Sequence, residues 1–398
     1  MPNMKIKTIK NLNLKNKKVL LRVDFDVPVK NGRVVDDTRI LAHLPTINFL
    51  LKQGARVILV SHLGQPSKVN SMRLKIQRYG LKPVFSYCKK IIKNLEFIES
   101  LEWETIKKET KNKKIVLLEN LRFYPGEKMN DKNFAKFLAS LADIYVDDAF
   151  AVCHRAHASV SAITKCLPSY AGLLLEKEIK NLSEALVKPK RPFIVLIGGA
   201  KISTKMLVLK TLAKKADKIL IGGALANDIL KSMGYKVGES LVEKDSQVKM
   251  APLLIKKIVL PIDLKIKSKQ TKNVKTQELN NLKNKDFKIL DIGPATIELF
   301  AKYLRGAKMI VWNGPVGLFE EKPFEQGTVK LFKEILKNKK AKIIIGGGDT
   351  IACLRQANLK SQISNLKNNV FVSTGGGAML EFLSGKILPG IKPLLEGY

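Results

Sequence analysis

A repeated pattern of short apolar runs, each followed by small, polar or charged residues, constrains the fold of this 398-residue chain most strongly. Helix-like stretches separate the runs, which is typical of parallel strands buried on both faces. In such sheets ligands bind beyond the carboxyl ends of the strands, where the polar residues would lie. The runs are KVLLRVDFD (18–26), RVILVSHLGQP (56–66), KIVLLENLRFYPG (114–126), DIYVDDAF (143–150), PFIVLIGGAK (192–201), KILIGGALAN (218–227), KMIVWNGPVG (308–317), KIIIGGGDT (342–350) and NVFVSTGGGAM (369–379).

The length and the strand endings both indicate two domains. Strands of the first half end in Asp, His and Arg, whereas strands of the second half end in glycines. Between the halves, Leu175, Ile179, Leu182 and Leu186 form one apolar stripe of a helix, which Pro189 and Pro192 would end. We therefore predict an α/β protein with two doubly wound, Rossmann-like parallel-sheet domains joined by a helix. The expected boundaries are 1–172 for the first domain, 173–191 for the linking helix and 192–380 for the second domain.

The formal net charge of +36 comes mainly from lysines spread along nearly the whole chain. A protein that binds nucleic acid more often concentrates positive charge on one face, with arginine and aromatic residues interleaved. We interpret the excess as a lysine-coated surface and expect no specific nucleic-acid partner. Incidental binding of polyanions through counterion release is the second interpretation. The segment from Lys265 to Lys288, rich in Lys, Asn and Gln, is expected to be a solvated excursion of the second domain.

Cysteine spacing and hydropathy indicate the compartment. The four cysteines lie far apart and form no CxxC pair, so neither disulfides nor structural zinc are expected. No apolar run approaches the roughly 20 residues that cross a bilayer. The basic start leads into a strand-like run, not into the apolar region of a signal peptide. We therefore expect a cytoplasmic protein with no membrane association.

Arginine is scarce in this chain, yet eight of its eleven arginines lie before residue 160. Several of them, and one histidine, sit at or just past predicted strand ends or in the loops nearby. Guanidinium groups carry a permanent charge and bind phosphate or carboxylate in a bidentate manner, so these positions favour an anion site. The alternative is that each arginine pairs with a nearby carboxylate such as Asp37 or Asp148. The candidates are Arg39, Arg122, Arg155 and His62.

The stretch YVDDAFAVCHRAHAS (145–159) combines two histidines with two aspartates. His154 and His157 could share a helix face and bind a metal ion. The neighbouring cysteine and aspartates do not complete a familiar zinc spacing, so packing or orienting hydrogen bonds account for the histidines better. Asp147 and Asp148 would fix the turn after the strand or pair with bases.

Four glycine-rich turns follow predicted strands in the second half: GGAK (198–201), GGAL (222–225), GGGD (346–349) and GGGA (375–378). Glycine lets backbone amides approach a phosphate, and a following helix directs its positive end toward it. A single glycine-rich stretch after a strand is often only a tight turn and not a phosphate site. Four of them, with Lys201 and Lys205 beside the first and Asp349 in the third, indicate a nucleotide site with a magnesium ligand. The GxxxxGK[ST] and GxGxxG motifs are absent, which disfavours a P-loop or an NAD site.

These motifs resemble, in the same order and over essentially the whole chain, those of the phosphoglycerate kinase family. The resemblance implies a hinge-bending kinase of glycolysis and gluconeogenesis. Such an enzyme transfers a phosphoryl group reversibly between 1,3-bisphosphoglycerate with ADP and 3-phosphoglycerate with ATP, with Mg²⁺ on the nucleotide. The first domain would bind the glycerate, the second the nucleotide, and residues 381–398 would return to the first domain; a monomer is the family expectation. The motifs are RVDFDVP, DDTRI, SHLGQP, LLENLRFYPGE, HRAH, GGAK, DIGP, WNGPVG, GGGDT and STGGGA.

The resemblance also implies roles for individual residues. A glycerate pocket would comprise Asp24, Asp26, Arg39, His62, Gln65, Arg122 and Arg155. The nucleotide would contact Lys201, Lys205, Glu320, Gly347, Gly348, Asp349 and Thr350. Glu320 would meet the ribose and Asp349 the metal. Lys201 and Arg39 would neutralise the phosphoryl group in flight, helped by the amides of Gly375 and Gly376, with neither a covalent intermediate nor a general base.

The sequence departs from the family pattern at a few of these motifs. Asp26 and Asp147 stand where Asn is usual, Gln65 where Arg is usual, and Thr204 where Asp is usual. Ala151-Val152-Cys153 replaces the usual Gly-Thr-Ala. An exposed charge is worth about 1 kcal/mol, so Asp26 and Gln65 are expected to weaken glycerate binding without abolishing turnover. The alternative function is a nucleotide-binding homologue with weak or lost turnover.

Overall fold

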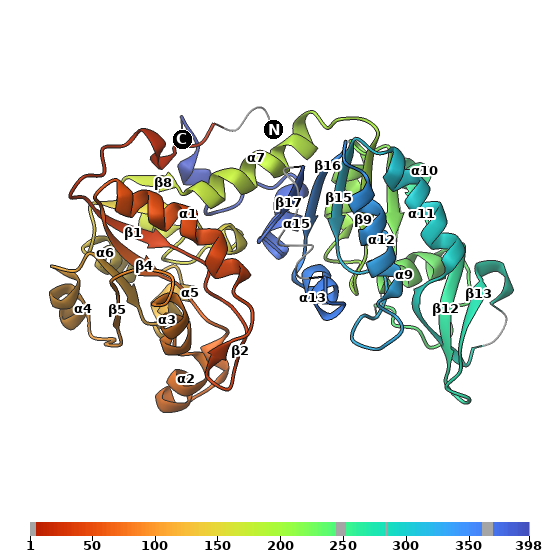
Figure 1. Cartoon of the computed structure of the whole chain (residues 1–398), viewed down its shortest axis with the longest axis horizontal. Helices are drawn as coiled ribbons and strands as arrows, with labels where there is room; N and C mark the ends of the chain where they lie inside the picture. The colour runs from red at the N-terminus through yellow and green to blue at the C-terminus, as the bar shows by residue number, and fades with distance from the viewer. Residues whose placement is uncertain (1–4, 244–251, 283–284, 360–368, 398) are drawn as a thin grey trace. The chain divides into compact units, whose positions relative to one another are not determined.

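The computed structural model describes residues 5–243, 252–282, 285–359 and 369–397 and divides the chain into two compact units (Figure 1). The N-terminal unit comprises Asn3–Lys180 together with Ile387–Tyr398, and the C-terminal unit comprises Asn181–Lys386. The last residues thus fold with the first half of the chain. Their return begins at Ile387, later than the expected residue 381, because residues up to Lys386 belong to the C-terminal unit.

The N-terminal unit contains a six-stranded sheet whose strands all run parallel, in the order β5-β6-β4-β1-β7-β8. Its strands are β1 (Lys18–Arg22), β4 (Arg56–Val60), β5 (Leu95–Ile98), β6 (Ile115–Leu118), β7 (Ile144–Asp147) and β8 (Ser169–Ala171). A short hairpin is formed by β2 (Val29–Lys30) and β3 (Arg33–Val34). The helices are α1 (Thr38–Lys52), α2 (Met72–Tyr79), α3 (Lys82–Cys88), α4 (Trp103–Thr110), α5 (Pro125–Lys128) and α6 (Lys132–Ala139).

The sheet of the N-terminal unit is buried on both faces. Val19 and Leu21 of β1 pack into one apolar core, whereas Leu20 between them packs into another. Successive side chains of a strand point to opposite faces, so two cores mean that helices cover both faces. This burial explains why the strands read as continuous apolar runs.

The C-terminal unit repeats this arrangement with the parallel strand order β11-β10-β9-β15-β16-β17. Its strands are β9 (Phe193–Ile197), β10 (Lys218–Ile221), β11 (Ile258–Val259), β15 (Met309–Asn313), β16 (Lys342–Gly346) and β17 (Val370–Val372). The helices are α8 (Met206–Ala213), α9 (Ala224–Ser232), α10 (Pro252–Lys257), α11 (Pro294–Gly306), α12 (Gln326–Lys337), α13 (Gly348–Gln356) and α15 (Gly377–Leu383).

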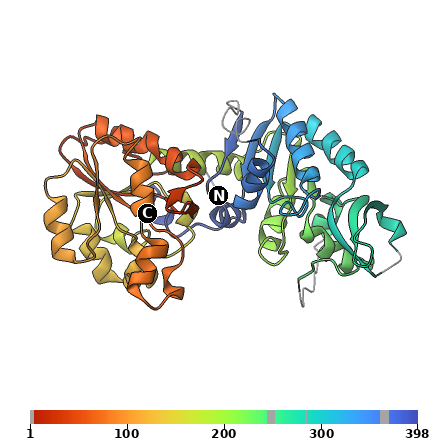
Figure 2. The same cartoon turned by 60° about the horizontal axis from the view of Figure 1, so that its bottom comes forward.

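Both sheets wind outward from a central first strand, which confirms the expected doubly wound α/β class (Figure 2). In the N-terminal unit the winding reverses between β1 and β7, and in the C-terminal unit between β9 and β15. The crevice outside the carboxyl ends of the strands at such a switch point is where open α/β sheets bind ligands. The predicted anion site and the predicted nucleotide site therefore belong at these two edges.

Helix α7 (Leu173–Val187) spans the boundary between the two units. Its predicted stripe is buried, with Leu175, Ile179 and Leu182 almost completely covered. The helix ends at Val187, ahead of the two prolines. Across the described part of the chain, no helix is both long enough and apolar enough to cross a membrane.

The expectation of a merely solvated excursion over residues 265–288 is wrong. The region forms an antiparallel sheet of β13 (Val274–Glu278), β12 (Asp263–Ser268) and β14 (Phe287–Ile292). Leu264, Ile266 and Phe287 pack beneath it in one apolar cluster with Leu230 of α9 and Val237. Of these three strands only β13 is mostly exposed. Its Lys- and Gln-containing sequence led to the prediction of a solvated excursion.

The returning C-terminal segment crosses the loop after β7 at Gly390, whose amide donates to the Cys153 carbonyl oxygen at 2.9 Å. A Cβ atom on Gly390 would lie 2.7 Å from Val160 Cγ1 and 3.0 Å from Cys153 Cα. We therefore expect Gly390→Ala to lower the free energy of unfolding by about 1–3 kcal/mol, as overpacking does. Urea unfolding followed by circular dichroism measures this loss.

The matched control is Gly306→Ala at the end of α11, where a Cβ atom would meet nothing within 4 Å. This substitution should leave the free energy of unfolding unchanged or raise it slightly, because alanine restricts the unfolded chain. Equal losses in the two variants would contradict the tight crossing at Gly390.

Candidate active site

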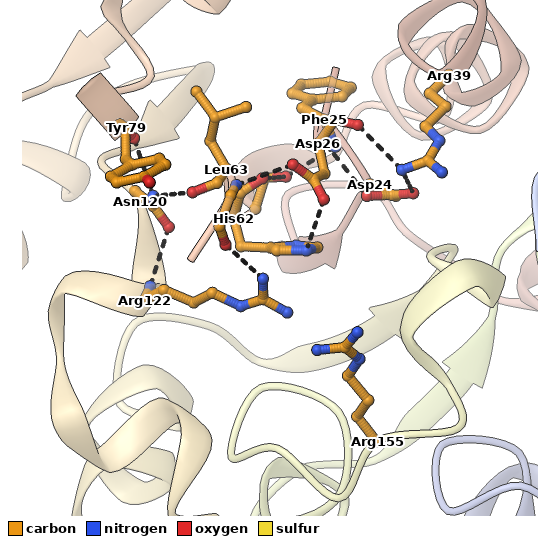
Figure 3. A network of polar contacts seen from close by, with 12 residues as sticks. Asp24, Phe25, Asp26, Arg39, His62, Leu63, Tyr79, Asn120, Arg122 and Arg155 are labelled. Carbon is orange, nitrogen blue, oxygen red and sulfur yellow. Dashed lines mark hydrogen bonds and ion pairs between the residues drawn. The ribbon is translucent and has the colours of Figure 1, made fainter. Parts of the chain in front are cut away.

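The residues proposed for anion binding follow neighbouring strands of the N-terminal sheet at its carboxyl edge. Arg122 lies in a 3-10 turn after β6, His62 follows β4, Asp24 and Asp26 follow β1, and Arg155 lies in the loop after β7. Since β6, β4, β1 and β7 are consecutive in the sheet, the structure brings these side chains to one place (Figure 3). Arg39 joins them from the first turn of α1.

Arg39 is held by the turn after β1. Its Nη1 atom donates to the Asp26 carbonyl oxygen at 3.0 Å and lies 3.0 Å from Asp24 Oδ2. The second contact is an ion pair without hydrogen-bond geometry, so the buried Asp24 Oδ2 accepts no hydrogen bond among the described residues. Asp24 therefore keeps an acceptor position for a ligand hydroxyl. Arg39 pairs with the nearby carboxylate of Asp24, so the alternative of pairing with a carboxylate holds for this arginine.

Asp26 carries its negative charge inside this group of basic residues. Burial alone would raise the pKa of its carboxyl group. The hydrogen bond from His62, the Gly64 amide at 2.9 Å and the Arg39 guanidinium together hold that pKa well below its usual range. Asp26 is therefore ionised at neutral pH, with its charge offset by its neighbours.

The ring of His62 has one possible tautomer. Its Nδ1 atom lies 3.1 Å from Arg22 Nη2, and arginine can only donate, so Nδ1 must accept. The proton then sits on Nε2, which lies 3.5 Å from Asp26 Oδ2. Burial, with the nearby charges of Arg22 and Arg122, lowers the pKa of His62. The ring is neutral at neutral pH, and its N–H faces the Asp26 carboxylate.

Arg122 and Arg155 carry positive charge that no described carboxylate pairs with directly, although Asp26 and Glu127 act on Arg122 from farther away. Figure 3 shows their guanidinium groups pointing toward the same region beside His62. Arg122 donates to the Gly64 carbonyl oxygen, but its buried Nε and Nη2 atoms have no hydrogen-bond partner among the described residues. Burial and the charges of Arg155 and Arg22 lower the Arg122 pKa to about 10. No described carboxylate forms an ion pair with either arginine, so this pair fits a bound anion.

Several supporting residues were not singled out by the sequence argument. Asn120 accepts from the Arg122 amide at 3.0 Å and donates to the carbonyl oxygens of Leu63 and Tyr79. It thereby joins the Arg122 turn to the His62 loop. Its place in the sequence NLRF was the only signal for this role. An asparagine before a turn usually indicates only an ordinary cap.

The loop that carries Arg155 is anchored by a buried acid. Glu127 of α5 accepts from the Ser159 amide at 3.0 Å and from the Ser159 hydroxyl at 2.7 Å. Arg22 Nε donates to the same hydroxyl oxygen at 3.0 Å. The Nδ1 atom of the buried His157 lies 3.6 Å from Glu127 Oε1. His157 thus packs and orients, while His154 Nε2 accepts from Arg155 Nε at 3.3 Å.

Asp147 fixes the turn after β7, whereas Asp148 pairs with the base His43, so each of the two interpretations holds for one of the aspartates. Asp147 Oδ1 accepts from the Ala149 amide at 2.9 Å, and its Oδ2 accepts from Cys153 Sγ at 3.4 Å. Burial raises the pKa of Asp147 to about 6, against the effects of the Ala149 amide and Arg22. Asp148 Oδ1 accepts from the amides of Leu174 and Leu175 at the start of α7.

Gln65 lies exposed directly before the 3-10 turn Pro66–Lys68, and its side chain has no hydrogen-bond partner among residues 5–243 or the other described ranges. Arginine at this position would add one solvent-exposed positive charge to the rim.

In the C-terminal unit, loops after β9, β10 and β15 interlock through backbone hydrogen bonds. The Gly199 amide donates to the Pro315 carbonyl oxygen at 2.8 Å, and the Gly223 amide donates to that of Val316 at 2.9 Å. A Cβ atom on Gly198 would lie only 2.0 Å from the Pro315 oxygen. Close backbone approach is thus the physical reason for the first glycine pair.

Lys205 is a buried ammonium group within these loops. It donates to the Gly198 carbonyl oxygen, and burial lowers its pKa to about 8 against the opposing charge of Asp349. Lys201 is exposed, and the Thr204 hydroxyl donates to its carbonyl oxygen at 3.0 Å. The Ser203 amide donates to Glu243 at 2.9 Å, which ties the loop down from outside.

A cavity of about 420 Å³ opens beside these loops. Leu264, Ile289 and Leu318 give it apolar walls, and Glu320 and Asp349 lie at its lining. An apolar cleft next to phosphate-binding loops is the arrangement that a nucleotide base requires. Thr350 lies beneath, where its hydroxyl accepts from the Gly314 amide at 2.8 Å.

The remaining nucleotide-site candidates occupy the starts of two helices. Gly347 and Gly348 begin α13, and Gly375 and Gly376 precede α15 after β17, all at the carboxyl edge of the sheet. Gly347 and Gly376 have φ of +99° and +48°, which suits glycine. In the described ranges no three His, Cys, Asp or Glu side chains gather as a metal cage. The single carboxylate of Asp349 fits Mg²⁺, which commonly binds through one or two carboxylates plus substrate phosphates.

Comparisons with known proteins agree with this geometry. The family model described as Phosphoglycerate kinase matches residues 9–386. The chain is 46% identical to the phosphoglycerate kinase of Thermosipho africanus, covering 96% of each chain, and 45% identical to that of Pseudothermotoga lettingae, covering 99% of each.

Solved structures show the same relationship in three dimensions. The phosphoglycerate kinase of Coxiella burnetii matches with a TM-score of 0.81 at 37% identity, over 98% of this chain and 99% of that one. The phosphoglycerate kinase of Pyrococcus horikoshii matches with a TM-score of 0.83 at 29% identity, over 98% of each chain. The chain belongs to the phosphoglycerate kinase family.

Proposed function

We propose that this chain catalyses reversible phosphoryl transfer between 1,3-bisphosphoglycerate with ADP and 3-phosphoglycerate with ATP, as in glycolysis and gluconeogenesis. The observation that carries the proposal is the pair Arg122 and Arg155, whose guanidinium charges have no carboxylate partner among the described residues. A substrate with both a phosphate and a carboxylate group suits that unbalanced charge.

The glycerate ligand would be held from several sides. Arg122 and Arg155 would bind its phosphate beside the neutral ring of His62, whose Nε2–H faces Asp26. The buried Oδ2 of Asp24 would accept from the substrate hydroxyl. Asp26 would act through Arg39 and His62, and Gln65 would supply a polar group at the rim without a charge.

The nucleotide would bind in the C-terminal unit. The cavity lined by Leu318 and Glu320 would take the base and ribose, and the turn from Gly347 to Thr350 would take the phosphates together with Lys201 and Lys205. Asp349 would hold Mg²⁺ on those phosphates. When bound, the ion neutralises phosphate charge.

Phosphoryl transfer requires the protein to position the reactants and to neutralise charge, and it requires no covalent bond to the protein. A carboxylate oxygen of 3-phosphoglycerate would form a bond to the γ-phosphorus as the bond to the ADP oxygen breaks, with no proton moved. Arg39, Lys201 and the amides of Gly375 and Gly376 would neutralise the charge of the transferring group. The two units would close during turnover, because an acyl phosphate must be kept from water.

The second candidate is a homologue that binds nucleotide but turns over weakly, suggested by Thr204 and Gln65. The expected cytoplasmic location and monomeric state rest on the scattered cysteines and on the family resemblance. They remain predictions.

A coupled assay of ATP-dependent phosphorylation of 3-phosphoglycerate tests the proposed activity. We expect turnover that is lost in Lys201→Met. Nucleotide binding without turnover in the unaltered protein would instead support the second candidate, and absence of both would overturn the family assignment of function.

The buried Lys205 makes the use of nucleotide dependent on pH. A lysine with a pKa lowered to about 8 is charged below that pH and neutral above it, so its contribution to phosphate binding is lost as the pH rises. We expect kcat/KM for ATP to fall above about pH 8, since this quantity reports groups of the free enzyme.

Lys205→Arg is the control, because arginine stays charged over this range. Its kcat/KM for ATP should show no fall between pH 8 and 9.5, whatever its absolute value. The Lys205 assignment is wrong if both proteins give the same profile.

The rim position Gln65 should set the affinity for the glycerate substrate. We expect Gln65→Arg to lower the KM for 3-phosphoglycerate about two- to fivefold at low salt, the size of one exposed charge contact. KM for ATP should not change. The gain should shrink at 0.5 M salt because exposed charges are screened.

Gln65→Met removes the amide without adding charge, and its KM for 3-phosphoglycerate should stay close to that of the unaltered protein. If Gln65→Arg and Gln65→Met behave alike, the glutamine does not limit glycerate binding.

A further inference from the structure

We propose that His43 is a positioning residue for the glycerate site, acting through the backbone of Asp24. The inference rests on the proposed function for the identity of the ligand. His43 lies in the middle of α1 and is almost fully buried, without a place in any of the motifs that suggested the site. A lone histidine in a helix is more often a core residue that only packs. The contacts of His43 therefore decide whether it also positions the site.

The His43 ring is fixed in one tautomer. Its Nε2 atom lies 2.9 Å from the backbone nitrogen of Asp24, and its Nδ1 atom lies 2.8 Å from Asp148 Oδ2. An amide can only donate, so Nε2 must accept and Nδ1 must carry the proton. The ring therefore donates to Asp148 and accepts from Asp24, and it packs edge-on against Phe25.

Asp148 sets this tautomer while capping α7. Its Oδ1 atom accepts from the amides of Leu174 at 2.9 Å and Leu175 at 3.3 Å, so only Oδ2 faces the histidine. A Cβ atom on Gly172 would lie 2.1 Å from Oδ1, which leaves the carboxylate little freedom to move. The start of α7 and the imidazole are thus joined through one buried side chain.

At its other end, this series of hydrogen bonds reaches the turn after β1, which carries the proposed glycerate contacts. Asp24 Oδ1 accepts from the Asp26 amide at 3.3 Å, and Asp24 Oδ2 pairs with Arg39. Without an acceptor at His43 Nε2, the buried Asp24 amide would have no partner, and such a group is costly to bury. The turn would shift to expose it, moving Asp24 and Arg39 away from the ligand.

Two conservative variants separate the two hydrogen bonds of His43. His43→Gln places an acceptor oxygen near the position of Nε2, and His43→Asn places a donor nitrogen near the position of Nδ1. His43→Leu supplies neither. Each of Gln and Asn loses one hydrogen bond, so their melting temperatures should fall by similar amounts.

We expect His43→Asn and His43→Leu to raise the KM for 3-phosphoglycerate about three- to tenfold, the effect of one displaced hydrogen-bonded contact. His43→Gln should stay within about twofold of the unaltered protein, and KM for ATP should not change in any variant. A KM that follows the melting temperature, or that rises equally in Gln and Asn, would overturn the proposal.

Asp148→Asn tests the tautomer. With its oxygen retained for α7, its amide nitrogen faces His43 Nδ1, which moves the ring proton to Nε2 opposite the Asp24 amide. We expect the same rise in KM for 3-phosphoglycerate. In the His43→Gln background Asp148→Asn should add no further rise, because glutamine accepts from Asp24 without regard to residue 148.

The outcomes distinguish this inference from the proposed function. An unaltered protein without turnover would refute the function, whereas normal turnover with an unchanged KM in His43→Leu would refute the role of His43 alone.

Discussion

The buried guanidinium of Arg22 is the interaction on which the N-terminal site depends. Arg22 ends β1 and is fully covered, yet all three of its nitrogens are used: Nε on the Ser159 hydroxyl, Nη1 on the carbonyl oxygens of Val23 and Val60, and Nη2 on His62. A buried charge is tolerated only when it is satisfied in this way. One side chain thus sets the tautomer of His62 and holds the loop that carries Arg155.

The candidate sites of the two units are built by different physical means. The N-terminal unit gathers side-chain cations: Glu127 lies close to the charge of Arg22, while Arg122 and Arg155 form no ion pair with a described carboxylate. In the C-terminal unit the candidate site consists of glycine loops whose backbones hydrogen-bond to one another, with the Lys205 ammonium buried among them. Fixed guanidinium forks suit a small, highly charged acid, whereas amides and an apolar cleft suit a nucleotide.

Much of the fold could be predicted from the sequence, because strands buried on both faces read as continuous apolar runs. The small antiparallel sheet could not, since the exposed β13 shows only lysines and polar residues and its core consists of scattered side chains such as Leu264 and Phe287. At the site, residues at strand ends were found because their places follow from the parallel sheet. Arg22, Glu127 and His43 were missed, because their importance lies in contacts between segments distant in the chain, such as the 105 residues that separate His43 from Asp148.

We propose that the unpaired guanidinium groups of Arg122 and Arg155 bind the glycerate substrate. Isothermal titration of 3-phosphoglycerate in the absence of nucleotide tests it most directly, with Arg122→Gln compared to the unaltered protein. A desolvated charge contact to phosphate predicts a loss of at least about tenfold in affinity for 3-phosphoglycerate, with the affinity for ATP unchanged. An unchanged affinity for 3-phosphoglycerate would contradict the account.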